Sequence, residues 1–156
     1  MAGTSHGGII TLLAVTRMDL AAAVCAYGVA DTFTWYKYLT DNGFDVSDPL
    51  SLKVYGKGPA DKPEAFSSRA PALNADKIHT PLLLLYGDKD TTVPLSQGQE
   101  MADALARLGK PYQLMVIEGA THGFIFHIDP TKRNVEERAR ADKAWKAMLA
   151  FLKVHL

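Results

Sequence analysis

The chain opens on a glycine-rich turn around a serine, GTSHGG at residues 3–8, which matches the pattern G-x-S-x-G. In a nucleophile elbow, this pattern places the serine on a sharp turn between a strand and a helix, and the glycines avoid collisions between a β-carbon and the neighbouring backbone. Residues 9–15 follow as an apolar run with helical spacing, as an elbow requires. A flexible tail is the alternative interpretation, because only Met1 and Ala2 precede the motif where a strand is needed.

Three apolar runs predict strands further along the chain. They are residues 21–27, 81–87 and 112–117, and the first two are of the kind that suits a parallel strand covered on both faces. Strands that alternate with helices predict βαβ units with right-handed crossovers. We therefore expect one α/β domain over residues 1–156, with a mostly parallel sheet flanked by helices.

The segments between and after these runs predict helices. Residues 31–39 predict a short aromatic helix capped by Asp31, and the Gly- and Pro-rich residues 40–75 predict an irregular excursion with one or two short helices. Longer helices are predicted at residues 95–108 and after a cap at Asn134. The apolar faces expected in these two helices are Met101, Ala104, Leu105 and Leu108 in the first, and Trp145, Met148, Leu149, Leu152 and Leu156 in the second.

Composition excludes several classes of partner. Lys plus Arg and Asp plus Glu both number 17, so no net charge attracts nucleic acid or an anionic membrane. No signal peptide is visible, and no apolar run approaches the ~20 residues of a membrane span.

The lone Cys25 lies in an apolar run, which predicts a core thiol and favours a reducing, cytoplasmic compartment. With no H-E-x-x-H motif and no cysteine pair, we expect no metal and no cofactor.

Three reactive side chains follow three of the predicted strands. Ser5 lies in the elbow, Asp90 follows the strand at 81–87, and His122 follows the strand at 112–117. Sites in open parallel sheets lie beyond the carboxyl ends of the strands, and Ser, Asp, His is the chain order of α/β-hydrolases. The imidazole can take the proton of the weakly nucleophilic hydroxyl, and the carboxylate fixes the imidazole tautomer.

Four stretches resemble the prolyl oligopeptidase (S9) family, near its acylaminoacyl-peptidase and dipeptidyl-peptidase-like branches. They are residues 3–8, 26–29, 76–94 and 118–124. The resemblance covers nearly the whole chain and corresponds to the C-terminal part of the family's catalytic domain. It implies a truncated α/β-hydrolase fold without the N-terminal strands. It also implies a catalytic triad of Ser5, Asp90 and His122, with Asp90 preferred to Asp88 because of its place between Gly87 and Val93-Pro94.

The chain departs from this family in what precedes the elbow. The β-propeller, several sheet strands and the second oxyanion donor of the family have no counterpart in the sequence, and the backbone N–H of His6 would be one donor to the oxyanion. Loss of one donor typically costs ~10²–10³ in turnover, so we expect a slow enzyme. The strand at 21–27 would be left with an open edge, and we therefore expect a homodimer or a larger assembly that covers it.

The sequence therefore predicts a serine hydrolase that cleaves small acyl esters, with amides or peptides as a second substrate class. Tyr27, Trp35 and Phe124 are candidate pocket walls, with ordinary core contacts as the alternative. His6 is expected in the pocket wall without acting as the base. The remaining histidines, His79, His127 and His155, are expected to be structural or solvent-facing. A fragment that serves only as an assembly module is the rival interpretation, and a missing half encoded upstream of Met1 is another.

Overall fold

The computed structural model describes residues 1–47, 49–126 and 131–156. Its centre is a sheet of four strands that are all parallel and lie in chain order. The strands are β1 (Ala2–Thr4), β2 (Ala23–Ala26), β3 (Leu82–Gly87) and β4 (Tyr112–Ile117). Every residue of β2 and β3 is buried, as the continuous apolar runs predict for strands covered on both faces.

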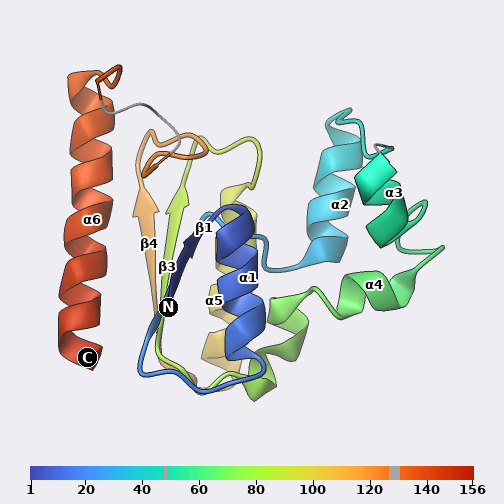
Figure 1. Ribbon diagram of the computed structural model, residues 1–156, viewed down its shortest axis with the longest axis horizontal. Coiled ribbons are helices and arrows are strands. Elements are labelled where there is room, and N and C mark those ends of the chain that lie inside the picture. Colours follow the sequence, from blue (N-terminus) through green and yellow to red (C-terminus); the bar gives the residue numbers. More distant parts are fainter. Residues whose placement is uncertain (48, 127–130) are drawn as a thin grey trace.

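Helices cover both faces of this sheet. Helices α1 (His6–Val15) and α5 (Leu95–Arg107) lie on one face, and α6 (Val135–His155) lies on the other (Figure 1). The predicted aromatic helix is α2 (Thr32–Asp41). The described part of the irregular region contains three short helices where one or two were predicted: α3 (Pro49–Tyr55), α4 (Pro63–Ser67) and the 3₁₀ helix η1 (Pro71–Lys77). Helices α2, α3 and α4 project away from the sheet, beyond α1 (Figure 1).

The N-terminal strand corrects two expectations. A strand does precede Ser5, because Ala2–Thr4 pairs with β2, and the amino group of Met1 donates to the carbonyl of Ala22 at 3.0 Å. Three residues are too few for a periodic pattern, so the sequence could not reveal β1. β2 therefore has strands on both sides, and the open edge expected at residues 21–27 is wrong. The edge strands of the sheet are β1 and β4.

The predicted helix caps are confirmed. Asp31 precedes α2, and its carboxylate accepts hydrogen bonds from the backbone N–H groups of Phe33 and Thr34. Asn134 precedes α6 and forms a capping box with Glu137, in which each side chain accepts a hydrogen bond from the other residue's backbone N–H.

The predicted apolar faces of α5 and α6 are partly wrong. In α5, Leu108 lies at the C-cap and is 48% exposed, whereas the other three predicted residues are buried. In α6 the sheet-facing residues are Ala141, Ala144, Met148 and Phe151. Three members of the predicted stripe point outward and are exposed: Trp145, Leu149 and Leu156. Because alanine side chains are small, α6 can pack closely on the sheet through them. The larger side chains follow one position later in the sequence and form a second stripe on the outer side of the helix.

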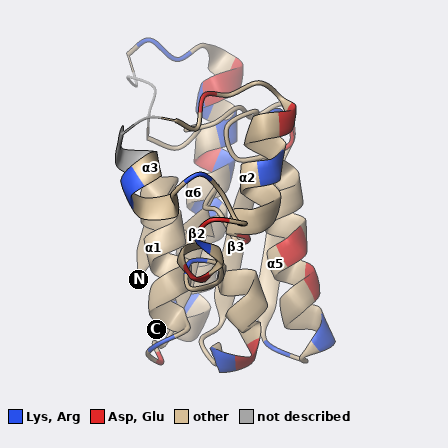
Figure 2. Cartoon of the chain, turned by 90° about the vertical axis from the view of Figure 1, so that its right-hand side faces the viewer, with Lys and Arg blue, Asp and Glu red and all other residues tan. Residues whose placement is uncertain are grey.

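The structure bears on the predictions made for Cys25, for membrane spans and for surface charge. Cys25 is a buried core residue, and burial raises the pKa of its thiol to about 12. No helix in the described part of the chain is long and apolar enough to cross a bilayer. On the face drawn in Figure 2, α2 and α5 carry charges of both signs, and α3 carries a basic residue. The prediction for His127 falls outside the described residues.

Candidate active site

Ser5 occupies a strained turn between β1 and α1. Its φ of 51° and ψ of −116° are rare for a residue with a side chain. The turn is held by its own backbone, because the N–H of Ser5 donates to the carbonyl of Ala26 at 2.9 Å and its carbonyl accepts from Gly8 at 2.8 Å. The hydroxyl is therefore fixed at the N-terminus of α1, and the backbone N–H of the next residue, His6, belongs to the first helical turn.

Close backbone contacts explain three of the glycines around this turn. A β-carbon on Gly3 would lie 2.0 Å from the carbonyl oxygen of Gly7, and one on Gly8 would lie 2.8 Å from the Cα of Gly28. A β-carbon on Gly28 would in turn lie 2.6 Å from the carbonyl carbon of Gly8. Gly7 has open space where its β-carbon would be, so the steric explanation predicted for every glycine of the motif is wrong at this position.

Ser5, His122 and Asp90 form one hydrogen-bonded chain. The hydroxyl of Ser5 lies 2.8 Å from Nε2 of His122, and Nδ1 of the same ring lies 2.7 Å from Oδ2 of Asp90. The three residues follow β1, β4 and β3, so parallel strands bring them to the same end of the sheet. With Nδ1 directed at a carboxylate, Nε2 is the ring nitrogen that can accept a proton from the hydroxyl.

Asp90 is oriented by its own loop. Its side chain is fully buried, and Oδ1 accepts hydrogen bonds from the backbone N–H groups of Thr92 and Val93, both at 2.9 Å. These two bonds leave Oδ2 for His122. Asp88 is exposed and bonds to the N–H of Gly119 instead, so the sequence-based choice of Asp90 over Asp88 agrees with this geometry.

Tyr27 lies against the imidazole and Phe124 lies against Tyr27, and neither is among the residues that line the neighbouring cavity. The ring of Tyr27 meets the rings of His122 and Phe124 edge-on, with centroids 5.0 Å apart in both pairs. Tyr27 is fully buried with a φ of 41°, and burial raises the pKa of its hydroxyl. These contacts restrict the rotation of the His122 ring.

A cavity of about 690 Å³ opens beside Ser5. Its apolar lining comes from α1, the residues after β2, helices α2 and α3, and the loop after β3: Ile9, Ile10, Leu13, Val29, Trp35, Leu39, Val46, Val54 and Val93. Of the three predicted wall residues, Trp35 lines this cavity, and its indole N–H donates to the carbonyl of Thr92 at 3.0 Å. His6 also lines the cavity, and the volume is that of a small-molecule pocket.

Two side chains that the sequence analysis did not select lie near this cavity. Arg69 lines it, and the buried Gln97 fastens the start of α2. The side-chain oxygen of Gln97 accepts from the N–H groups of Ala30 and Asp31, at 3.0 and 2.9 Å. Gln97 acts on a segment remote in the sequence, and Arg69 reaches the cavity wall only through the tertiary fold, so no local pattern marks either side chain.

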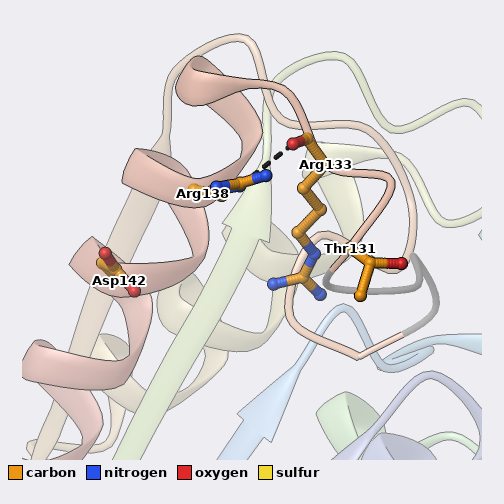
Figure 3. Close-up of a pocket in the computed structure, with 4 residues that line it drawn as sticks. All are labelled: Thr131, Arg133, Arg138 and Asp142. Atoms are coloured by element: carbon orange, nitrogen blue, oxygen red, sulfur yellow. Dashed lines mark hydrogen bonds between the residues drawn. The ribbon is translucent and has the colours of Figure 1, made fainter.

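A second cavity, of about 500 Å³, lies beside the N-terminal half of α6 (Figure 3). It is lined by Thr131, Arg133, Arg138 and Asp142. Nε of Arg138 donates to the carbonyl of Arg133 at 3.0 Å. The lining includes none of the predicted site residues. Across the described ranges, no group of three or more His, Cys, Asp or Glu residues could hold a metal ion.

Comparison with known proteins identifies the family. A family model described as the prolyl oligopeptidase family matches residues 1–156. The chain belongs to the prolyl oligopeptidase family. Among curated relatives, the uncharacterized peptidase YtmA of Bacillus subtilis is 31% identical over 134 residues, and the match covers 85% of this chain and 48% of that protein. This chain thus spans about half the length of that relative.

Solved structures agree with the family and show the fold. A puromycin-hydrolyzing peptidase of Mycobacterium tuberculosis superimposes with a TM-score of 0.78 at 30% identity, over 99% of this chain and 21% of that one. An acylaminoacyl peptidase of Pyrococcus horikoshii gives a TM-score of 0.79 at 24% identity, over 99% of this chain and 23% of that one. The fold is thus a partial α/β-hydrolase fold of the prolyl oligopeptidase family, as the sequence predicts.

Proposed function

We propose that this chain is a serine hydrolase that cleaves small acyl esters through an acyl-enzyme intermediate, with amides or peptides as a second substrate class. The hydrogen-bonded chain Ser5–His122–Asp90 supports the proposal more than any other observation. Membership of the prolyl oligopeptidase family supports hydrolysis as the reaction type. An ester has the better leaving group, which is why we rank esters first. The lone buried Cys25 fits a cytoplasmic location, which stays part of this proposal.

The mechanism follows from the order of the three side chains. Oγ of Ser5 attacks the acyl carbon while Nε2 of His122 removes the hydroxyl proton. Asp90 keeps the ring in the required tautomer and stabilises the imidazolium that forms. When the C–O bond to the leaving group breaks, His122 returns the proton to the departing alkoxide. Water then attacks the acyl-serine by the same route and releases the carboxylic acid and Ser5.

The tetrahedral intermediate places a negative charge beside the start of α1. The backbone N–H of His6 belongs to the first turn of that helix, where free N–H groups and the helix dipole favour an anion. We assign this N–H as one oxyanion donor.

Labelling with a fluorophosphonate tests the proposal directly. The wild-type chain should be modified at Ser5 and should hydrolyse p-nitrophenyl acetate and butyrate, whereas Ser5→Ala should do neither. Ser67→Ala, which changes an exposed serine on α4, is the matched control and should behave as wild type. Modification elsewhere, or equal turnover by Ser5→Ala, would exclude Ser5 as the nucleophile.

A homodimer or larger assembly is the second part of the proposal, and an inactive assembly module is the alternative function. Two surfaces support the homodimer or larger assembly. The outer edge of β1 has no strand partner among the described residues, and the outer stripe of α6 exposes Trp145, Leu149 and Leu156. We propose that a second copy covers the open sheet edge and this stripe.

Light scattering at micromolar concentration tests this assembly. We expect at least a dimer, and Leu149→Lys should shift the chain towards the monomer because it places a charge in the proposed contact. Glu118→Lys, an exposed change outside the stripe, is the control. A clean wild-type monomer contradicts the assembly. A folded oligomer without turnover would favour the assembly module over the hydrolase.

A further inference from the structure

Arg69 is a cation in the wall of the otherwise mostly apolar cavity beside Ser5. Nη1 of its guanidinium donates to the carbonyl of Ala65 at 3.0 Å, with a longer contact to Oγ of Ser68 at 3.4 Å. The guanidinium carbon lies 5.7 Å from the centre of the Tyr55 ring, which also lines the cavity. These contacts hold the guanidinium in place, but none of them supplies a negative charge.

The described part of the chain does not neutralise Arg69. The ion pairs between described residues all involve other side chains, and the two hydrogen bonds of Arg69 are both donated by Nη1. A guanidinium carries five N–H donors, so the donors on Nε and Nη2 are left for a ligand. Burying part of a charge without a counter-charge is costly, which makes an anionic ligand the natural partner.

Besides the two tyrosines Tyr36 and Tyr55, two other titratable groups face the same cavity. His6 lines it next to the nucleophile, and Asp45 lines it from the segment after α2. Asp45 is exposed, and its Oδ1 accepts hydrogen bonds from the backbone N–H and the hydroxyl of Ser47. Water and salt screen this exposed carboxylate more than they screen the half-buried guanidinium. The half-buried charge in the wall is therefore positive.

We propose that Arg69 is a specificity-determining residue that binds a carboxylate at the far end of the acyl group. This inference rests on the proposed function, because it assigns the substrate class of the same site. The preferred substrates are then monoesters or monoamides of dicarboxylic acids, with the scissile carbonyl at Ser5 and the second carboxylate on Arg69. The aliphatic chain between them contacts the apolar walls, and the guanidinium fork can bind the carboxylate with two parallel hydrogen bonds.

A pair of esters of equal chain length tests this assignment. Mono-p-nitrophenyl adipate carries a terminal carboxylate, and p-nitrophenyl hexanoate has the same number of acyl carbons without one. We expect the wild-type ratio of kcat/KM for adipate over hexanoate to exceed one and to fall as salt is added. Arg69→Met, which keeps an aliphatic stem, should lower this ratio about 10–100-fold, the effect of losing hydrogen bonds to a charged group.

Two variants control for other effects. Arg69→Lys keeps the charge without the fork and should give an intermediate ratio. Arg107→Met removes an exposed arginine from the last turn of α5 and should leave the ratio at its wild-type value. A ratio that is the same in wild type and Arg69→Met overturns the inference while hexanoate turnover preserves the proposed function. If Arg69→Met does not fold, the Arg69→Lys ratio decides in the same way.

A binding measurement separates this inference from catalysis. Titration calorimetry of Ser5→Ala with monomethyl adipate should show binding that Arg69→Met in the same background weakens at least tenfold, whereas methyl hexanoate should not discriminate between the two. If the wild-type chain hydrolyses neither p-nitrophenyl ester, the proposed function fails, and this titration alone decides the role of Arg69. Equal binding of monomethyl adipate with and without Arg69, or no binding at all, overturns the inference.

Discussion

The two sides of the Ser5 cavity are held by different kinds of contact. On the sheet side, which we call the strand-end centre (Ser5, Asp90 and His122), backbone lies directly on backbone. Gly8 and Gly28 are so close that a β-carbon on either would lie within 2.8 Å of the other's main chain. The strand-end centre can move little without moving the sheet.

The opposite side, which we call the cap (helices α2, α3 and α4), is attached mainly by side chains. Trp35 and Tyr38 of α2 donate to the carbonyls of Thr92 and Thr91, in the loop that carries Asp90. Gln97 of α5 holds the start of α2. The difference shows that the reaction geometry depends on the sheet, whereas the shape of the cavity depends on a few replaceable hydrogen bonds.

The largest effect should come from the carboxylate of the strand-end centre. Asp90→Asn keeps an oxygen for the N–H groups of Thr92 and Val93 but presents an amide N–H to His122, which favours the wrong ring tautomer. We expect kcat on p-nitrophenyl acetate to fall about 10³–10⁴-fold with no loss of folding. Asp88→Asn, two residues earlier in the same turn, should stay within a few-fold of wild type. Similar losses in the two variants would mean that the turn, and not the His122 contact, is what matters.

The next effect tests the backbone contact beneath the elbow. Gly28→Ala places a β-carbon 2.6 Å from the carbonyl carbon of Gly8 and 2.8 Å from the N of Ile9, and backbone cannot move aside cheaply. We expect the free energy of unfolding to fall by about 1–3 kcal/mol, measured by urea denaturation, and activity to fall with it. Gly7→Ala is the control. Its β-carbon meets nothing within 4 Å inside a helix, so it should be neutral or slightly stabilising.

Local patterns in the sequence predict much of the strand-end centre. The elbow motif, the apolar runs that became β2, β3 and β4, and the caps Asp31 and Asn134 can each be recognised from a few consecutive residues. Parallel strands then place the residues after them at one end of the sheet. The meeting of Ser5, Asp90 and His122 therefore follows from the topology and not from chain proximity.

The parts that the sequence did not predict depend on distant partners. Gln97 accepts hydrogen bonds from backbone N–H groups 66 and 67 residues away. The proposed role of Arg69 depends on its place in the cavity wall, which only the fold reveals. In α6, two adjacent stripes have helical spacing, and the pattern alone does not say which one meets the sheet. The large residues Trp145 and Leu149 suggested one stripe, and packing of the sheet on Ala141 and Ala144 selects the other.

A smaller effect should come from the cap. Trp35→Phe keeps an aromatic wall but removes the hydrogen bond to the carbonyl of Thr92, worth about 0.5–1.5 kcal/mol. We expect KM for p-nitrophenyl butyrate to rise about 2–10-fold with kcat nearly unchanged, because the change affects binding in the ground state and the transition state alike. Tyr38→Phe removes the parallel bond to Thr91 and is not among the residues that line the cavity. An equal KM change in both variants would assign the effect to loop position and not to the wall.

The smallest effect concerns Glu100, which joins the cap to α5. Its Oε2 accepts from the hydroxyl of Thr34 at 2.6 Å and from Nε2 of Gln97 at 3.3 Å, and burial raises the pKa of this carboxyl above its usual value. A raised folded pKa means that the wild type loses stability as pH rises from the unfolded value of about 4.3 through the folded one.

Glu100→Gln has no such charge to bury. Its melting temperature should therefore match that of wild type below about pH 4 and exceed it at pH 7, by less than about 4 °C because the group is partly exposed. Glu118→Gln, at an exposed position, should show no such dependence on pH. If the difference in melting temperature between Glu100→Gln and wild type is the same at both pH values, the hydrogen bonds of Glu100 and not its buried charge determine how firmly the cap is attached to α5. The cap would then be attached by neutral contacts throughout, which would make its contrast with the strand-end centre sharper.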